Sequence, residues 1–178
     1  MSCRTTNLLA GLARDCSNNM GGIKKLYAID ADDVTSVAED ANGVVQLSGG
    51  SKTLTLASSK HFVEYYLPPE SASLVITPTV NPQNGNAYVT SVLTFNMTKM
   101  NATKRVEINT LMLGNLHIIA EDNNGVLWYL GVERPVEFTG GAQSQTGTAY
   151  ADLNAYGAEL TYVSLKYPPT ANGDVPLT

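Results

Sequence analysis

The chain has 178 residues, which is enough for one domain with a substantial hydrophobic core. Its formal net charge is -5, which argues against a surface that holds phosphate backbones with Lys and Arg. Only 15% of the residues are charged, and this low share favours either a surface that neighbouring subunits cover or simply a β-rich composition.

Residues 1–22 are predicted to form a polar N-terminal arm. They lack the long apolar core of a signal peptide, and no part of the chain has the ~18 consecutive apolar residues of a membrane helix. Cys3 and Cys16 are too few for a zinc site, which needs about four ligands. Two free thiols in a reducing cytoplasm are favoured over a disulfide between them. We therefore expect a protein that is made in the cytoplasm and has no membrane partner.

Residues 23–167 are predicted to form a single β-rich domain, which a polar tail at 168–178 follows. Runs rich in β-branched and aromatic residues predict strands at 23–30, 44–47, 53–57, 61–68, 116–122, 126–131 and 158–167. Turn-forming residues separate most of these runs, which indicates antiparallel pairing. A linker rich in Gly and Thr, 139–157, precedes the last strand.

The clearest pattern is a long β-hairpin at 71–99. Apolar and polar side chains alternate along SASLVITPTV and again along AYVTSVLTFNMT, although Ser91 interrupts the second apolar face. Pro78 cannot donate a ladder hydrogen bond, so its strand is predicted to lie at a sheet edge or to bulge there. No Lys or Arg blunts this edge between residues 71 and 98, so we predict that it pairs with another copy of the chain.

One helix is predicted at 102–113, with Asn101 as its N-cap and Gly114 as its C-terminal stop. Its apolar side chains cover well over half of the circumference, which is typical of a helix buried on more than one side. We expect a loop or another subunit to cover the second side. Together the elements predict an all-β fold: an antiparallel β-sandwich or incomplete barrel with one packed α-helix and a long β-hairpin.

Two stretches nearly repeat each other: AEDANGVV at 38–45 and AEDNNGVL at 120–127. Asn-Gly between apolar runs is a strong hairpin signal, so the favoured interpretation is the same turn used twice. The alternative is a pair of calcium sites, with oxygen ligands from Asp40, Asn42, Asp122 and Asn124. Neither copy has the Glu that completes an EF-hand loop, and the acidic cluster of Asp30, Asp32 and Asp33 has the same gap. We therefore predict turns and no metal site.

The sequence offers no positive case for catalysis. His61 and His117 are the only histidines, and each is predicted on a strand with apolar neighbours. Neither lies in a recognised nucleophile or metalloprotease motif. The carboxylates of Glu64, Glu121 and Glu133 are scattered, and spacing alone pairs none of them as glycosidase acids. We predict no catalytic residue and no cofactor.

Trp128 and Tyr129 offer a carbohydrate platform as an alternative function. Adjacent strand residues point to opposite faces of a sheet, however. At least one of the two rings is therefore predicted to lie in the core.

From Gly114 onward, the chain has a characteristic order of features. GNLHIIAEDNNGVLWYLG predicts a strand, an acidic Asn-Gly turn and a second strand that ends in Gly; TGGAQSQTGTAYADLNAYG is a Gly- and Thr-rich loop, and AELTYVSLKYPP is a final strand. This order resembles the tail tube proteins of long-tailed bacteriophages, particularly those that infect Bacteroidetes-type hosts. The opening CSNNMGGIKKLYAIDADDVTSV, the long hairpin and the single helix suit the same family.

The resemblance implies a structural virion protein. Proteins of this family fold as a β-sandwich or incomplete barrel and assemble into hexameric rings whose inner strands close a β-barrel around a lumen. The rings stack through loops and terminal arms, other tail or neck proteins adjoin them, and DNA passes through the lumen without specific binding. A neck or tail-completion ring protein is the alternative within this class. A carbohydrate-binding β-sandwich and a small hydrolase are the alternatives from other classes.

Overall fold

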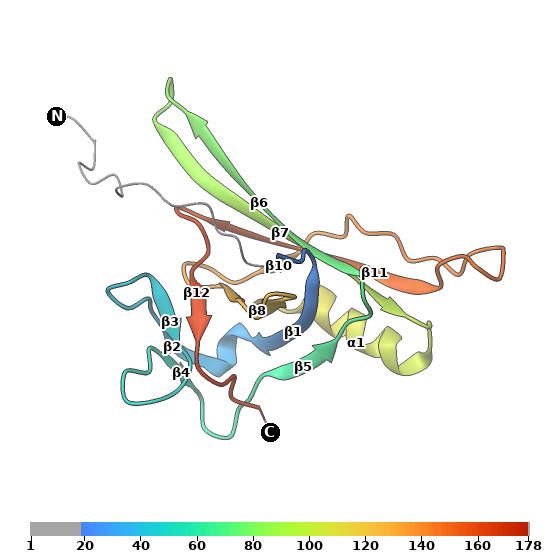
Figure 1. Ribbon diagram of the computed structural model, residues 1–178, viewed down its shortest axis with the longest axis horizontal. Helices are drawn as coiled ribbons and strands as arrows, with labels where there is room; N and C mark the ends of the chain where they lie inside the picture. The colour runs from blue at the N-terminus through green and yellow to red at the C-terminus, as the bar shows by residue number, and fades with distance from the viewer. Residues whose placement is uncertain (1–18, 178) are drawn as a thin grey trace.

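The computed structural model describes residues 19–177, and these residues form a mostly β fold (Figure 1). Strands hold 46% of the residues and helices 9%, and the sheets do not close into a barrel. The predicted all-β, sandwich-like fold with one packed α-helix is therefore confirmed. Both cysteines and most of the predicted N-terminal arm lie outside the described residues.

The larger sheet has six strands in the order β3-β12-β9-β8-β1-β5. The strands are β1 (Ile23–Asp30), β3 (Val44–Gln46), β5 (Val63–Tyr66), β8 (Leu116–Asp122), β9 (Leu127–Leu130) and β12 (Thr170–Asn172). All neighbours run antiparallel except β12 and β3, which are parallel. The strands predicted at 23–30 and 116–122 have the predicted bounds.

The short strand β12 is the main difference from the sequence prediction. The sequence predicts a polar tail without a strand after residue 167, but Thr170 pairs with Val44 of β3 on one side and with Trp128 of β9 on the other. The tail is also held near its end, where the Pro176 carbonyl accepts from the Phe62 amide at 3.0 Å. A strand of three residues is too short to show a strand pattern in its sequence. Its pairing therefore depends on contacts with residues distant in the chain.

A second sheet has four strands in the order β10-β11-β7-β6. The strands are β6 (Ala72–Asn81), β7 (Asn86–Thr98), β10 (Glu137–Phe138) and β11 (Ala155–Ser164). The predicted hairpin is thereby confirmed as β6 and β7. β11 begins at Ala155 rather than at residue 158, because its register with β7 runs from Thr98 to Val89 without a break.

A small third sheet pairs β2 (Val34–Val37) with β4 (Leu54–Leu56), and the 3-10 turn η1 (Ala31–Asp33) precedes it. The sequence prediction missed β2 and β10. Both are short, and their burial patterns include exposed side chains, so they lack the apolar runs that mark the other strands.

Apolar side chains lie on both faces of the six-stranded sheet, because neighbouring strand residues point to opposite sides. One core lies between the two large sheets and receives Leu26 and Ile118 from one sheet and Leu93 and Leu160 from the other. A second core, on the far face, contains Ile119 together with side chains of the β2-β4 sheet. The six-stranded sheet is therefore a middle layer, which explains why five consecutive residues of β8, from Leu116 to Ala120, are buried without alternation.

The helix α1 (Ala102–Leu113) has the predicted bounds. Asn101 caps it as predicted, since its side-chain oxygen accepts from the Lys104 amide at 2.8 Å. Gly114 ends the helix in an extended conformation, with φ of -88, rather than in the left-handed conformation common at helix ends. Buried side chains of α1 join the first core. The opposite apolar side chains stay exposed: Val106, Met112 and Leu113.

Candidate functional site

The repeated stretches form the same turn at both places. Asp40 Oδ1 accepts from the amides two and four residues later, at 2.8 and 3.1 Å, and Asp122 Oδ1 does the same at 2.8 and 2.9 Å. Gly43 and Gly125 take positive φ angles of 74° and 85°, which glycine allows without strain. The prediction of one turn used twice is confirmed. Only the second copy closes a hairpin of adjacent strands, β8 and β9.

The turn hydrogen bonds occupy oxygens that a calcium ion would need. The second oxygen of Asp40 accepts from Gln46 Nε2 at 2.8 Å, and this bond and the two amide bonds hold the pKa of the Asp40 carboxyl below its usual value. In the acidic cluster, Asp30 caps η1 and Asp33 pairs with Lys60 at 3.0 Å. In the part of the chain that the structure describes, no three His, Cys, Asp or Glu side chains cluster as metal ligands.

The two histidines have different surroundings. His61 is exposed in the loop before β5, not on a strand as predicted, because strand pairing starts only at Val63. His117 lies on β8 as predicted and is buried, with its Nδ1 3.0 Å from the Tyr129 hydroxyl. Gly131 packs on the ring, since a Cβ there would lie 2.6 Å from Nδ1. Burial lowers the pKa of His117 to about 4, so the ring is neutral at neutral pH.

The three carboxylates considered from the sequence do not meet in one site. Glu64 pairs with Lys25 at 2.9 Å, and Glu121 pairs with Lys24 at 2.7 Å. Glu133 instead accepts from a backbone amide at 2.8 Å. Each carboxylate therefore has a structural contact of its own.

The candidate carbohydrate platform is not formed by the predicted pair. Tyr129 is fully buried, and Trp128 is half-buried against the first core with its Nε1 3.4 Å from Asp122. The prediction that at least one of the two rings lies in the core is confirmed. The two rings do not share a face, because they are adjacent on β9.

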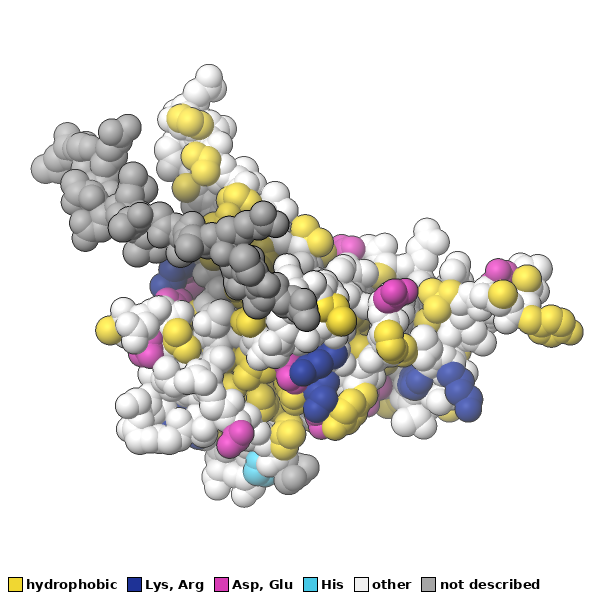
Figure 2. Space-filling view, viewed as in Figure 1, with side chains coloured by type: hydrophobic (Ala, Val, Ile, Leu, Met, Phe, Trp, Pro, Cys, Tyr) yellow, Lys and Arg dark blue, Asp and Glu magenta, His cyan; other side chains and the backbone are white. Residues whose placement is uncertain are grey.

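The four-stranded sheet has an open outer face. Its outward side chains are half-buried or exposed and mostly small: Ser73, Val75, Thr77, Thr90, Val92, Thr94, Thr161 and Val163. None of its four strands contains Lys or Arg, and its only charged side chains are Glu137 and Glu159. Figure 2 shows the projecting hairpin without a single basic or acidic side chain.

Within residues 19–177, no strand lies beyond β6 at one edge of this sheet, and the two-residue β10 forms the other edge, where the adjoining Val136 exchanges two backbone hydrogen bonds with Leu116 of β8. This confirms the edge position predicted from Pro78. The Asn96 amide donates to the Ser71 carbonyl. The backbone groups of every second residue from Ser71 onward, such as Thr77, therefore form hydrogen bonds with β7. The amides between them, such as that of Ile76, point outward. Pro78 is one of the residues whose backbone nitrogen points outward. Its missing amide hydrogen therefore costs the hairpin no hydrogen bond.

The end of the hairpin extends beyond the rest of the sheet (Figure 1). Pairing of β7 with β11 stops at Val89, opposite Ser164, whereas β6 and β7 continue to pair as far as Asn81 and Asn86. Val80 in this extension is 68% exposed. This part of the hairpin has no cover from the described chain.

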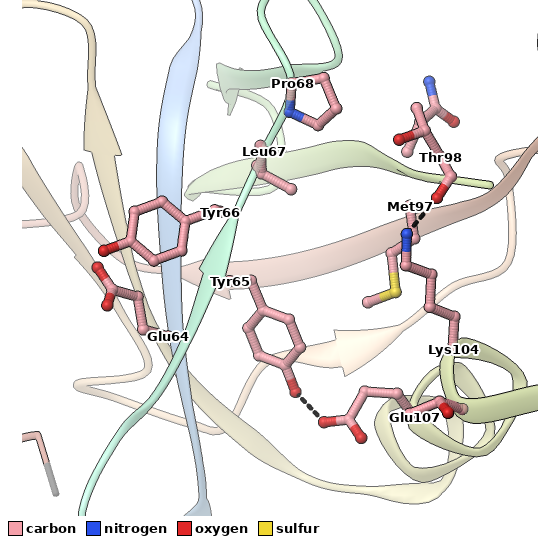
Figure 3. A pocket seen from close by; sticks show the side chains of 11 residues that line it. Glu64, Tyr65, Tyr66, Leu67, Pro68, Met97, Thr98, Lys104 and Glu107 are labelled. Atoms are coloured by element: carbon pink, nitrogen blue, oxygen red, sulfur yellow. Dashed lines mark hydrogen bonds between the residues drawn. The ribbon is translucent and has the colours of Figure 1, made fainter. Parts of the chain in front are cut away.

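A pocket of about 440 Å³ opens at the other end of the sheet, between β5, the end of β7 and the start of α1 (Figure 3). We call it the β5–α1 pocket. Tyr65 donates from its hydroxyl to Glu107 at 2.6 Å, and Lys104 donates to the Thr98 carbonyl. Burial raises the pKa of Tyr65. No sequence pattern indicates this pocket, because its walls come from three segments that meet only in the fold.

Comparison with protein-family models, with curated proteins and with solved structures gives no match for this chain. Among the described residues, no helix has the length and apolar character to cross a membrane.

Proposed function

We propose that this protein is a tail tube subunit of a long-tailed bacteriophage, a structural protein of the virion. The observation that carries the proposal is the open four-stranded sheet, which ends in the long edge strand β6 and has no Lys or Arg. Soluble proteins usually blunt a long free edge with Lys, a bulge or a covering loop, because the edge otherwise pairs with other chains. β6 has ten residues and no Lys, and Pro78 is the one residue of the strand without an amide hydrogen; so long an edge is consistent with pairing between copies.

In the proposed ring, β6 of one copy pairs with the β10–β11 edge of the next copy. This contact joins two different edges, so it is a head-to-tail contact that closes when the rotation between copies completes a circle. Closure leaves no free edge and forms one continuous barrel around a lumen. Six copies per ring is the number that the resemblance to the family implies.

The outer face of the sheet has the chemistry of a DNA conduit. Positioned toward the lumen, it offers DNA mainly Thr, Ser and Val together with Glu137 and Glu159. Basic side chains would hold the polyanion through counterion release, and all described Lys and Arg lie outside this sheet. DNA therefore slides past this surface without being retained.

Two further surfaces support assembly. The apolar side chains on the exposed side of α1 and the uncovered end of the hairpin both present apolar area to water. A subunit contact on α1 supplies the second covered side that the sequence predicts for this helix. A contact at the hairpin end lets one ring stack on the next.

Electron microscopy and sizing chromatography of the full-length protein test this proposal. We expect rings with a central channel that stack into tubes as the protein concentration rises. Single rings that never stack would indicate the neck or tail-completion ring protein instead. A protein that stays monomeric up to millimolar concentration would contradict both assignments.

A further inference from the structure

We propose that Tyr150 of one copy inserts into the β5–α1 pocket of the neighbouring copy in the ring. The inference rests on the proposed function, because the β6 contact with the β10–β11 edge brings the two parts together. Hydrogen bonds between backbones do not depend on the side chains, so they give this contact little specificity. The inserted Tyr150 side chain supplies that specificity.

The loop between β10 and β11, which contains Tyr150, extends away from the body of the fold (Figure 1). Asp152 Oδ2 accepts from two backbone amides of this turn, at 2.8 and 2.7 Å. Gln145 and Ala155 close the base of the loop with two backbone bonds, at 3.0 and 2.9 Å. The Tyr150 side chain is fully exposed, with a relative accessibility of 112%. An aromatic side chain on a hydrogen-bonded turn loses little conformational freedom on binding, as interface anchors do.

The β5–α1 pocket suits a tyrosine ring. Its volume of about 440 Å³ exceeds that of one tyrosine side chain, and Leu67, Pro68 and Met97 supply apolar walls (Figure 3). One carboxylate oxygen of Glu107 accepts from Tyr65, and the other is available to accept from an incoming hydroxyl. A buried tyrosine needs such a partner for its hydroxyl group.

Continuation of the sheet places the loop beside this pocket. The loop leaves from β10 at one edge of the sheet, whereas the pocket opens near the start of β6 at the opposite edge. Both lie at the same end of the strands, since Ala155, which closes the loop, pairs with Thr98, which lines the pocket. All copies in a ring point the same way, so the loop of one copy meets the pocket end of the next.

Charge favours the same contact. Asp152 is the only charged residue between 139 and 157, so the loop carries a negative charge. Three basic residues gather where β7 leads into α1, next to the pocket: Lys99, Lys104 and Arg105. Two carboxylates line the pocket as well, Glu64, which pairs with Lys25, and Glu107, which accepts from Tyr65. Opposite charges on the two surfaces direct the partners toward each other and fix their orientation.

Photo-crosslinking tests the contact directly. The full-length protein carries benzoylphenylalanine at position 150, and equal amounts of isotopically light and heavy protein are mixed before assembly. We expect crosslinks between light and heavy chains that map to residues 64–68, 96–98 or 103–107. Crosslinks within one chain, or to another surface of an assembled ring, overturn the inference but leave the proposed function intact. A protein without rings or crosslinks between chains overturns both.

Substitutions give an independent readout. We expect Tyr150→Ala, and Thr103→Trp at the exposed rim of the pocket, to raise the concentration of half-assembly roughly tenfold. Tyr150→Phe keeps the ring and should retain most of the assembly. Asn109→Trp, exposed on α1 but outside the pocket, is the matched control and should assemble like the parent protein. Equal assembly of Tyr150→Ala, Thr103→Trp and the parent would contradict the proposed anchor.

Discussion

At the scale of single residues, His117 makes folding sensitive to acid. Its pKa is about 4 in the folded chain because the ring is buried, against about 6.5 in an unfolded chain. Between these values the unfolded state binds more protons, so stability is complete above about pH 6.5 and falls as the pH falls toward 4. At about pH 5 the expected loss is about 2 kcal/mol of unfolding free energy.

Urea unfolding of the monomer at neutral pH and at about pH 5 measures this loss. His117→Gln removes the titrating group, so this variant should be less stable at neutral pH but lose less on acidification. His61→Gln is the control, because His61 is exposed, and it should behave like the parent protein. The same acid loss in His117→Gln and in the parent would assign the effect to other groups.

At the scale of elements, the decisive feature is which amides β6 leaves unpaired. The Ile76 amide points away from β7, so Ile76→Pro should leave the hairpin paired and remove one donor from the contact between copies. We expect the concentration of half-assembly to rise at least about tenfold, or ~1.4 kcal/mol per contact. Sizing chromatography and circular dichroism follow assembly and fold separately.

Two variants control for side chain and position. Ile76→Ala reproduces the loss of the side chain and should assemble better than Ile76→Pro. Thr90→Pro lies on β7, which is paired on both sides, and should disrupt the fold itself. Normal assembly of Ile76→Pro would show that copies do not pair through β6.

At the scale of the whole molecule, the absence of basic side chains from the open sheet should keep DNA mobile. Replacing Glu137 and Glu159 together by Lys reverses the charge of the face and leaves the backbone donors and acceptors of both edges unchanged. We expect assembled rings of this variant to retain DNA in low salt and to release it as salt rises. Filter binding or sedimentation with assembled protein measures the difference from the parent.

The matched control for this experiment is Asp174→Lys, at an exposed position just after β12 of the other large sheet. It adds a positive charge away from the proposed lumen and should leave DNA retention close to that of the parent. If Asp174→Lys retains DNA as well as the double variant does, the four-stranded sheet does not line the conduit.

The sequence by itself determined the elements whose signals are local. The helix at 102–113 follows from its side-chain period and the Asn101 cap, and the hairpin follows from alternation over two long runs around a turn. The repeated turn follows from one Asp carboxylate that bonds amides two and four residues on. Pro78 limited its strand to a sheet edge or a bulge, because proline lacks the amide that an interior strand would need, and the structure has the edge.

Only the tertiary structure decided which strands are neighbours. Thr170 lies between β3 and β9 although nothing in its own segment indicates a strand, and β7 became an interior strand because β11 pairs along it. The β5–α1 pocket depends on Tyr65 meeting Glu107, which is distant in the chain. Such contacts form because both faces of the middle sheet must be buried at once. Burial of both faces needs side chains from many parts of the chain, so no short stretch of sequence predicts which segments meet.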